Sequence, residues 1–223
     1  MSITFKGVKT SYSGMQKRGL TASEVPFGAF VTRSADGTVK AQVTNVPYEY
    51  LGVAVESEVE QRPYDGFFAA GKNVSYVATG VVNAWLLGGD TVDSGDFVRF
   101  PATLGAGTES LGVVSVESTP TTRTAYSVGR VTQTSDAGSA DYDQTIASIS
   151  GSTVTFGLAA TLTALGLVRG DYVVIDSNEA AEVNRIVDPA ASTVTCTCVK
   201  PPLATHANAI KMYKLVPIEI ELI

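Results

Sequence analysis

The sequence predicts an all-β protein made of β-barrel, β-tulip or sandwich units, preceded by an extended N-terminal arm. Three observations lead to this fold class. Short runs in which apolar and polar residues alternate recur along the whole 223-residue chain. Gly, Pro and Asp separate these runs at intervals of about ten residues, as they do in barrels and sandwiches. The periodicity of an amphipathic helix is almost absent.

The composition is that of a folded chain with few charges. Apolar residues make up 44% of the sequence and charged residues 17%, so uncharged polar residues must cover most of the surface. Such a surface suits contacts with other proteins. The net charge is −6 at pH 7, and a negative field repels phosphate. We therefore expect no binding to nucleic acid.

Hydropathy along the chain gives no sign of a membrane partner. No window reaches the roughly 18 uninterrupted apolar residues of a membrane span. The first residues also lack the apolar region of a signal peptide, so export by that route is not expected.

The first predicted element is the extended arm, residues 1–24. Four cations precede the first acidic residue, Glu24, and the other twelve Lys and Arg residues face 22 acidic ones. The chain is therefore a basic arm on a body with a net charge of −10. This arrangement can dock on an acidic neighbour, including a second copy of the chain, and a frayed, soluble terminus is the alternative. The cations proposed to bind a partner are Lys6, Lys9, Lys17 and Arg18.

Strands follow the arm. The best hairpin signal is Asp36-Gly37, in the run at 27–43, because this dipeptide readily adopts the backbone angles of a tight turn. Further runs with the alternation of a strand continue to the last residue of the sequence. They lie at 50–55, 73–87, 95–100, 111–117, 125–134, 146–158, 171–176, 180–187, 192–199, 209–215 and 217–223.

A polar stretch at 132–144 indicates a linker or an exposed loop. It divides the chain into a first β domain, residues 25–131, and a second β domain, residues 145–223. One large sandwich with a long surface loop is the alternative.

A turn motif occurs twice. The segment SGDFVRF at 94–100 returns as RGDYVVI at 169–175. In both copies Gly can take turn angles, Asp can bond the backbone, and an aromatic residue starts a strand. The tripeptide at 169–171 also matches one that cell-adhesion receptors bind, but the first copy has Ser94 in place of its arginine. We therefore interpret the tripeptide as a turn that leads into a strand.

Residue types that carry catalysis are scarce. His206 is the one histidine, and it lies in a loop rich in Pro and Ala, with no nucleophile motif to pair with it. We expect no enzymatic activity, and a catalytic group assembled from a distant Ser and Asp is the alternative. Cys196 and Cys198 alternate with Thr along a strand. Because the chain has no further thiol, we predict two core residues and no zinc site, and we expect no cofactor.

Acidic and amide residues gather in the segment DSNE at 176–179. This segment is faintly similar to the start of a calcium loop, but it lacks the Gly and the closing Glu of that loop. A solvated turn is the main interpretation, and a structural ion is the alternative.

The last predicted strand is PIEIELI at 217–223. Ile218, Ile220 and Leu222 share one of its faces. Pro217 removes one ladder hydrogen bond, which indicates a strand at the edge of a sheet. Because edge strands pair readily with other chains, we expect these three apolar residues, together with the arm, to hold contacts in an oligomer or a lattice.

Three segments follow one another in an order that resembles a known family. They are GVVNAWLLGGDTVDSGDFVRF at 80–100, LGVVSVE at 111–117 and AYSVGRVTQTSDAGSADYDQTI at 125–146. The order of an apolar strand, a Gly-Gly turn, a Gly-Asp turn before a strand and a later Val-Gly-Arg strand is similar to that of capsid decoration proteins. These are the small β proteins that decorate or cement the capsids of tailed bacterial and archaeal viruses. The resemblance covers residues 50–145 and rests on turn chemistry.

The resemblance implies a β-tulip or barrel fold, no enzymatic activity and a homotrimer bound to the major capsid protein at symmetry axes of an icosahedral shell. Such a protein is made in the host cytoplasm and lies on the outer capsid surface of the virion, where it bridges coat subunits. Many weak contacts repeated by symmetry then give avidity. The family pattern offers no individual functional residues to transfer. The alternative functions are a tail, fibre or head-completion component of the virion and a carbohydrate-binding β-sandwich.

Overall fold

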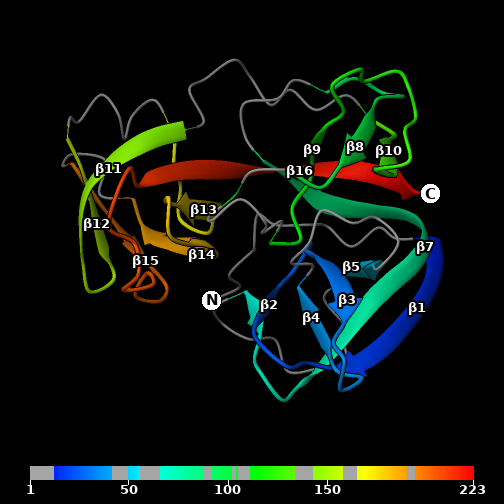
Figure 1. Cartoon of the computed structure of the whole chain (residues 1–223), viewed down its shortest axis with the longest axis horizontal. Coiled ribbons are helices and arrows are strands. Elements are labelled where there is room, and N and C mark those ends of the chain that lie inside the picture. The colour runs from blue at the N-terminus through cyan, green and yellow to red at the C-terminus, as the bar shows by residue number, and fades with distance from the viewer. Residues whose placement is uncertain are drawn as a thin grey trace.

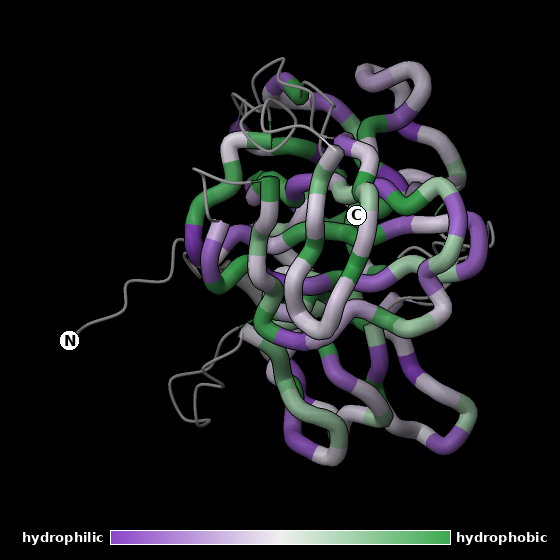
Figure 2. Tube along the Cα trace, turned by 90° about the vertical axis from the view of Figure 1, so that its left-hand side faces the viewer, coloured by the Kyte–Doolittle hydropathy of each residue, from purple (hydrophilic) through white to green (hydrophobic). Residues whose placement is uncertain are grey.

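The computed structural model describes residues 13–41, 50–55, 66–87, 92–101, 104, 111–133, 143–157, 165–189 and 194–223. Over these residues the chain is all-β, which confirms the predicted fold class (Figure 1). Fourteen of the strands described form one large sheet, and two short strands form another. In Figure 2, hydrophobic and hydrophilic residues alternate along many strands, as expected when one face of a strand is buried.

The strands form two barrel-like units, and the last strand runs through both. The first unit contains β1 (Ser13–Leu20), β2 (Val25–Pro26), β3 (Phe30–Arg33), β4 (Val39–Ala41), β5 (Tyr50–Ala54), β6 (Phe67–Phe68), β7 (Asn73–Leu87), β8 (Phe97–Arg99), β9 (Ser115–Val116) and β10 (Ser127–Val131). The second unit contains β11 (Asp143–Ser150), β12 (Thr153–Phe156), β13 (Tyr172–Asp176), β14 (Ala181–Asp188) and β15 (Thr195–Cys198). The shared strand is β16 (Lys211–Leu222).

The long strand β7 organises the first unit. Its first half pairs with β1, beginning at Leu20 opposite Asn73, and its second half pairs with β16. The strands β5, β3 and β4 follow β7 in that order. A single bridge between Thr21 and Val39 then brings the end of β1 back to β4. In the part of the first unit that the structure describes, a single bridge and not a continuous ladder closes the barrel-like ring.

The predicted hairpin at Asp36-Gly37 is confirmed and joins β3 to β4. Gly37 has a φ of 84°, which favours glycine. The Asp36 carboxylate accepts hydrogen bonds from the backbone N–H of Thr38 at 3.0 Å and from its hydroxyl at 2.6 Å. Local chemistry therefore fixes this turn, as the sequence indicates.

The second unit is a ring of six strands. The order is β11-β12-β15-β14-β13-β16, and pairing of β11 with β16 joins the two ends of the series. The ladder between β14 and β15 is irregular, so the ring is barrel-like without being a regular closed barrel. Buried side chains fill its interior. They are Ile146, Val154, Phe156, Leu165, Leu167, Val173, Ile175, Ile186, Cys196, Cys198 and Met212.

A third group of buried residues joins the two units. The Trp85 ring of β7 lies 4.8 Å from the Tyr172 ring of β13, measured between centroids. The Tyr172 hydroxyl donates a hydrogen bond of 2.6 Å to the carbonyl oxygen of Gly66, which precedes β6. Phe67, Val113 and other apolar residues complete this contact. Because it is apolar and buried, the contact holds the two units together as one body.

The strand β16 corrects the prediction of a terminal edge strand. Figure 1 shows β16 in red, running from the second unit to the C-terminus across the first. It pairs with β13 and β11 at its start, with β7 from Leu215 to Glu221, and with β10 at its end. The prediction of an edge was wrong because other strands pair with β16 both before and after Pro217. At Pro217 itself, among the described strands, β7 alone pairs with β16, so the missing N–H leaves the rest of the ladder intact.

The predicted arm and domain boundaries also need correction. Residues 13–20 of the predicted arm form β1, and its pairing with β7 places them in the sheet of the first unit. Residues 1–12 of the arm lie outside the described residues. The end of the chain, predicted to belong to the second domain, returns to the core of the first unit through Ile218 and Ile220. The predicted linker at 132–144 is described at residues 132–133 and 143–144, and residues 143–144 begin β11.

Candidate functional site

The two described cations of the predicted partner surface lie on β1. Lys17 and Arg18 are both exposed, opposite Tyr76 and Ser75 of β7. Neighbouring side chains of a strand point to opposite faces, so the two cations project from both faces of β1. Among the residues that the structure describes, β1 pairs along its length with β7 alone. Its other edge therefore presents backbone groups flanked by positive charge. The other two predicted cations, Lys6 and Lys9, lie outside the described residues.

The apolar residues predicted to bind a partner lie in the core of their own chain. Ile218 and Ile220 are 2% and 0% exposed, and Leu222 is half-buried against the same cluster. They pack beside Val82, Ala84 and other residues of the first unit. The prediction for these three side chains was wrong because the strand that carries them is internal.

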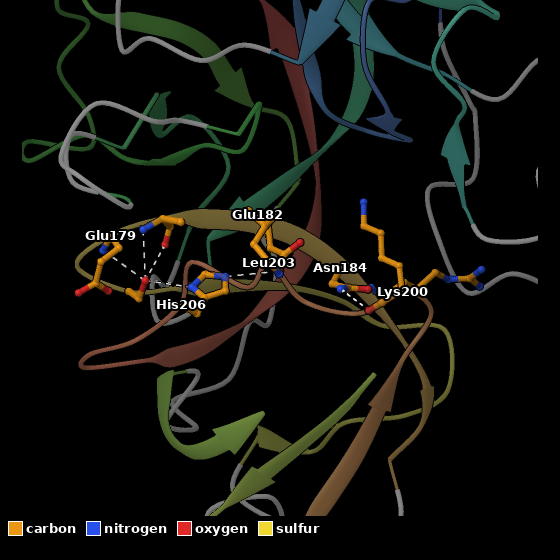
Figure 3. Close-up of polar contacts among 9 residues, drawn as sticks. Glu179, Glu182, Asn184, Lys200, Leu203 and His206 are labelled. Carbon is orange, nitrogen blue, oxygen red and sulfur yellow. Dashed lines mark hydrogen bonds and ion pairs between the residues drawn. The ribbon is translucent and has the colours of Figure 1, made fainter. Parts of the chain in front are cut away.

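The most concentrated group of polar side chains lies under the loop between β15 and β16. We call residues 199–210 the strap loop, because side chains fasten it to the hairpin of β13 and β14 (Figure 3). The Leu203 N–H donates to Glu182 Oε1 at 2.7 Å. The Asn208 side-chain amide donates to Glu179 Oε1 at 2.8 Å. The Asn184 amide donates to the carbonyl oxygen of Lys200 at 3.0 Å and holds the start of the loop.

His206 lies at the centre of this group. Its ring Nδ1 is 2.9 Å from the Ser177 hydroxyl oxygen, and its Nε2 is 3.4 Å from Glu182 Oε1. The imidazole is fully buried, and Nε2 forms no hydrogen bond with the described residues. His206 is therefore a locally bonded loop histidine that is closed off from solvent.

Glu182 is the carboxylate that faces this imidazole. Burial raises the pKa of Glu182, while the hydrogen bond from the Leu203 N–H and the nearby His206 and Lys200 side chains act in the opposite direction. Glu182 and His206 are therefore two adjacent ionisable groups, of which the imidazole is fully buried and the carboxylate is slightly exposed.

Ser177, His206 and Glu182 are the residue types of a hydrolytic triad. Their surroundings differ from those of such a triad, because the serine hydroxyl is neither free nor exposed. The Ser177 hydroxyl is tied to its own turn, since it accepts hydrogen bonds from the backbone N–H groups of Glu179 and Ala180 at 3.3 and 3.2 Å. Ser177 is also 5% exposed. Chemically, this arrangement places a carboxylate beside the imidazole, where it can act as the counter-ion of a charged ring. Sequence spacing did not reveal the group, because a turn, the strand β14 and a distant loop supply its members.

The cysteines occupy the positions that the sequence predicts. Cys196 and Cys198 are free and buried inside the second ring. The neighbouring Cys196 thiol and burial raise the pKa of Cys198, so this thiol has little thiolate character. Over the described ranges, no three His, Cys, Asp or Glu side chains are placed to hold a metal ion.

The repeated Gly-Asp turn is confirmed, and the structure adds a residue to it. Gly95 and Gly170 have φ values of 101° and 98°. Asp171 Oδ2 accepts the Val168 N–H at 2.8 Å and pairs with Lys214 Nζ at 2.8 Å. The carboxylate that an adhesion receptor would need is thus already bonded within the chain. In each turn, an arginine of the neighbouring strand also bonds to the glycine. Comparison of the two copies in the sequence did not reveal this arginine.

Fold and surface together define a class: an all-β protein of two barrel-like units that share a strand. The chain matches no protein-family model and no curated protein sequence. In the part of the chain that the structure describes, no helix has the length and apolar character needed to cross a membrane.

Proposed function

We propose that the protein is a virion structural protein, a capsid decoration or cement protein that binds the outer surface of an icosahedral shell as a homotrimer. In this role it bridges neighbouring subunits of the major capsid protein and catalyses no reaction. The proposal extends the sequence resemblance to such proteins.

The observation that carries the proposal is the basic outer edge of β1, which forms no ladder with any other strand that the structure describes. An unpaired edge can add a strand from another chain, and main-chain hydrogen bonds then supply affinity while side chains select the partner. Lys17 and Arg18 favour a partner segment with acidic side chains. The remaining chain is acidic, so this edge is distinct from the rest of the surface.

The buried contact between the units supports the same function. A protein that bridges two coat subunits transmits force between them, which requires a stiff body. Trp85, Phe67 and Tyr172 pack in one buried cluster between the units. An interface of this kind resists hinge motion more than a polar one does.

A binding experiment with charge reversals tests the proposed role of β1. The full chain and the double variant Lys17→Glu/Arg18→Glu are mixed with empty, expanded shells of the coat protein encoded in the same genome, and bound protein is measured after sedimentation. We expect the double variant to bind at least tenfold more weakly, about 1.4 kcal/mol. Arg33→Glu/Arg123→Glu is the control, since it reverses two exposed cations outside β1. Equal binding of both variants to the shells would contradict the role of β1.

The mass of the oligomer in solution distinguishes a decoration protein from a component of the tail or connector. We expect monomers or trimers in solution and trimers on shells, determined by native mass spectrometry and electron microscopy. A stable hexamer or dodecamer would instead favour a tail or connector ring. A wild-type chain that ignores the shells would overturn the proposal itself.

A further inference from the structure

The strap loop is held over a buried imidazole whose surroundings contain charges of both signs. Glu182 of β14 is the nearest of these, and Lys200 at the start of the loop acts on that carboxylate. Glu179 lies at the edge of the group, fully exposed and bonded to Asn208. The other titratable or charged groups on the elements packed here are Asp176 of β13, Cys198 of β15 and Lys211 of β16.

The number of protons on His206 and Glu182 decides whether the buried charge is balanced. With one proton between them, the pair is either an imidazolium beside a carboxylate or two neutral groups. With two protons, a buried imidazolium faces a neutral acid. An unbalanced charge in a site closed to water is strongly unfavourable, so the site must open or lose a proton.

We propose that the strap loop is a proton-controlled device, which stays fastened to the hairpin of β13 and β14 at neutral pH and is released when both His206 and Glu182 are protonated. The inference concerns a conformational property of the chain and does not depend on the proposed function.

The direction of the Glu182 pKa shift determines how early the counter-ion of His206 is lost. Because burial raises this pKa, the carboxylate is neutralised earlier during acidification than an exposed one. Protonation of Glu182 alone would favour the folded site, since a raised folded pKa means that the folded state binds the proton more tightly. The release therefore comes from the charge on His206 once its counter-ion has been neutralised.

Release of the strap loop has a consequence at the contact between the units. Lys200 Nζ pairs with Glu24 Oε2 at 2.5 Å and lies 4.3 Å from the centroid of the Phe67 ring. Both partners belong to the first unit. When the loop leaves the hairpin, this polar and cation–π contact loses the geometry that the loop provides.

Hydrogen exchange measured by NMR on the full chain tests the device. Protection of the Leu203 and Asn208 amides, whose partners are Glu182 and Glu179, is followed from pH 7 to pH 4 after correction for the intrinsic exchange rate. We expect protection of the Leu203 amide to fall at least tenfold, the change that one pKa unit of coupling produces. The amide of Gly170, bonded to the backbone of Ile186, is the control and keeps its protection.

Two substitutions shift the release in different ways. His206→Asn retains a side chain that can form a hydrogen bond with the Ser177 hydroxyl but cannot become charged, so the strap loop should stay fastened down to pH 4. Glu182→Gln removes the counter-ion, so release should occur at a higher pH than in the wild type. The proposal is overturned if wild-type protection does not change with pH, or if His206→Asn loses protection as the wild type does. If the Leu203 amide of the His206→Asn variant already lacks protection at pH 7, Glu182→Gln provides the test. In that case the proposal is overturned if release in Glu182→Gln occurs at the same pH as in the wild type or at a lower one.

Discussion

Arg185 holds the turn that precedes β13 by donating a hydrogen bond from Nε to the carbonyl oxygen of Gly170, at 3.1 Å. Its guanidinium carbon also lies 5.6 Å from the centroid of the Tyr172 ring. Arg130 makes the same two contacts in the first unit, with Gly95 at 3.2 Å and with the ring of Phe97 at 5.9 Å.

The other hydrogen bonds of the turn in the first unit also match those of the turn in the second unit. Gly95 and Gly170 donate their N–H groups to the residues that follow the two arginines, both at 2.8 Å. Asp96 and Asp171 each accept the N–H of the residue three positions earlier, at 2.9 and 2.8 Å. Each unit therefore contains one copy of a module in which glycine, aspartate, an aromatic ring and a cross-strand arginine fix the start of a strand.

Replacement of the buried arginine tests this module. We expect Arg185→Lys to lower the free energy of unfolding by about 1–2 kcal/mol, because lysine cannot donate from the Nε position and stack its head group flat on the ring. Urea denaturation measures the loss. Arg185 is 8% exposed, whereas Arg130 is exposed, so Arg130→Lys should cost less than about 0.5 kcal/mol. Equal losses would mean that burial does not strengthen this contact.

The contact between the units can be tested at one oxygen atom. Tyr172→Phe removes the hydroxyl that donates to Gly66 and leaves a buried carbonyl oxygen without that donor, so we expect a loss of about 1–2 kcal/mol in the free energy of unfolding. Tyr126 is 57% exposed, and Tyr126→Phe should change stability by less than about 0.5 kcal/mol. Thermal unfolding followed by circular dichroism compares the two variants, and a Tyr172→Phe chain as stable as the wild type would argue against this bond.

The close approach of β5 to its partner strand β7 requires glycine. At Gly52 the φ is 150°, and a Cβ atom would lie 2.0 Å from the backbone oxygen of Val77. Gly52→Ala should therefore cost about 3–5 kcal/mol or prevent folding. Gly37→Ala is the matched control, because Gly37 also has a positive φ but no heavy atom lies within 4 Å of the added Cβ. We expect a loss of about 1 kcal/mol there, from backbone strain alone. Similar losses in both variants, measured by urea denaturation, would rule out the steric cause.

Asp36 gives a prediction about pH. Hydrogen bonds from the Thr38 hydroxyl and N–H hold the pKa of Asp36 below its ordinary value of 3.8. A lowered folded pKa contributes stability that is present above 3.8 and is lost as the pH falls through the folded value. The Thr38 amide signal, followed by NMR, should therefore titrate with a midpoint below 3.8 and should not titrate in Asp36→Asn. A midpoint at or above 3.8 would contradict the role of these hydrogen bonds.

The sequence predicted those parts of the fold that depend on neighbours along the chain. Alternation identified the strands, and the dipeptide at Asp36 and Gly37 located a hairpin, because turn angles and side-chain direction are local properties. The Gly-Asp turns were found for the same reason. The arginines were missed because each lies on a partner strand, at a distance along the chain that differs between the units: 35 residues from Gly95 and 15 from Gly170.

Tertiary structure decided the roles of the two ends. The strand at 217–223 has the same alternation at an edge or in an interior, so the sequence could not show that β16 joins both units. Pro217 indicated a missing hydrogen bond correctly, but one unpaired position does not make a strand an edge. The group around His206 likewise depends on the folding of a loop onto a hairpin 29 residues away.

By itself, then, the sequence determined an all-β chain, its turns and the uneven distribution of its charge. The fold alone decided which strand edges stay open and which ionisable groups meet in a buried site. The physical reason is range: backbone angles and alternation act over a few residues, whereas pairing and burial depend on segments brought together from distant parts of the chain.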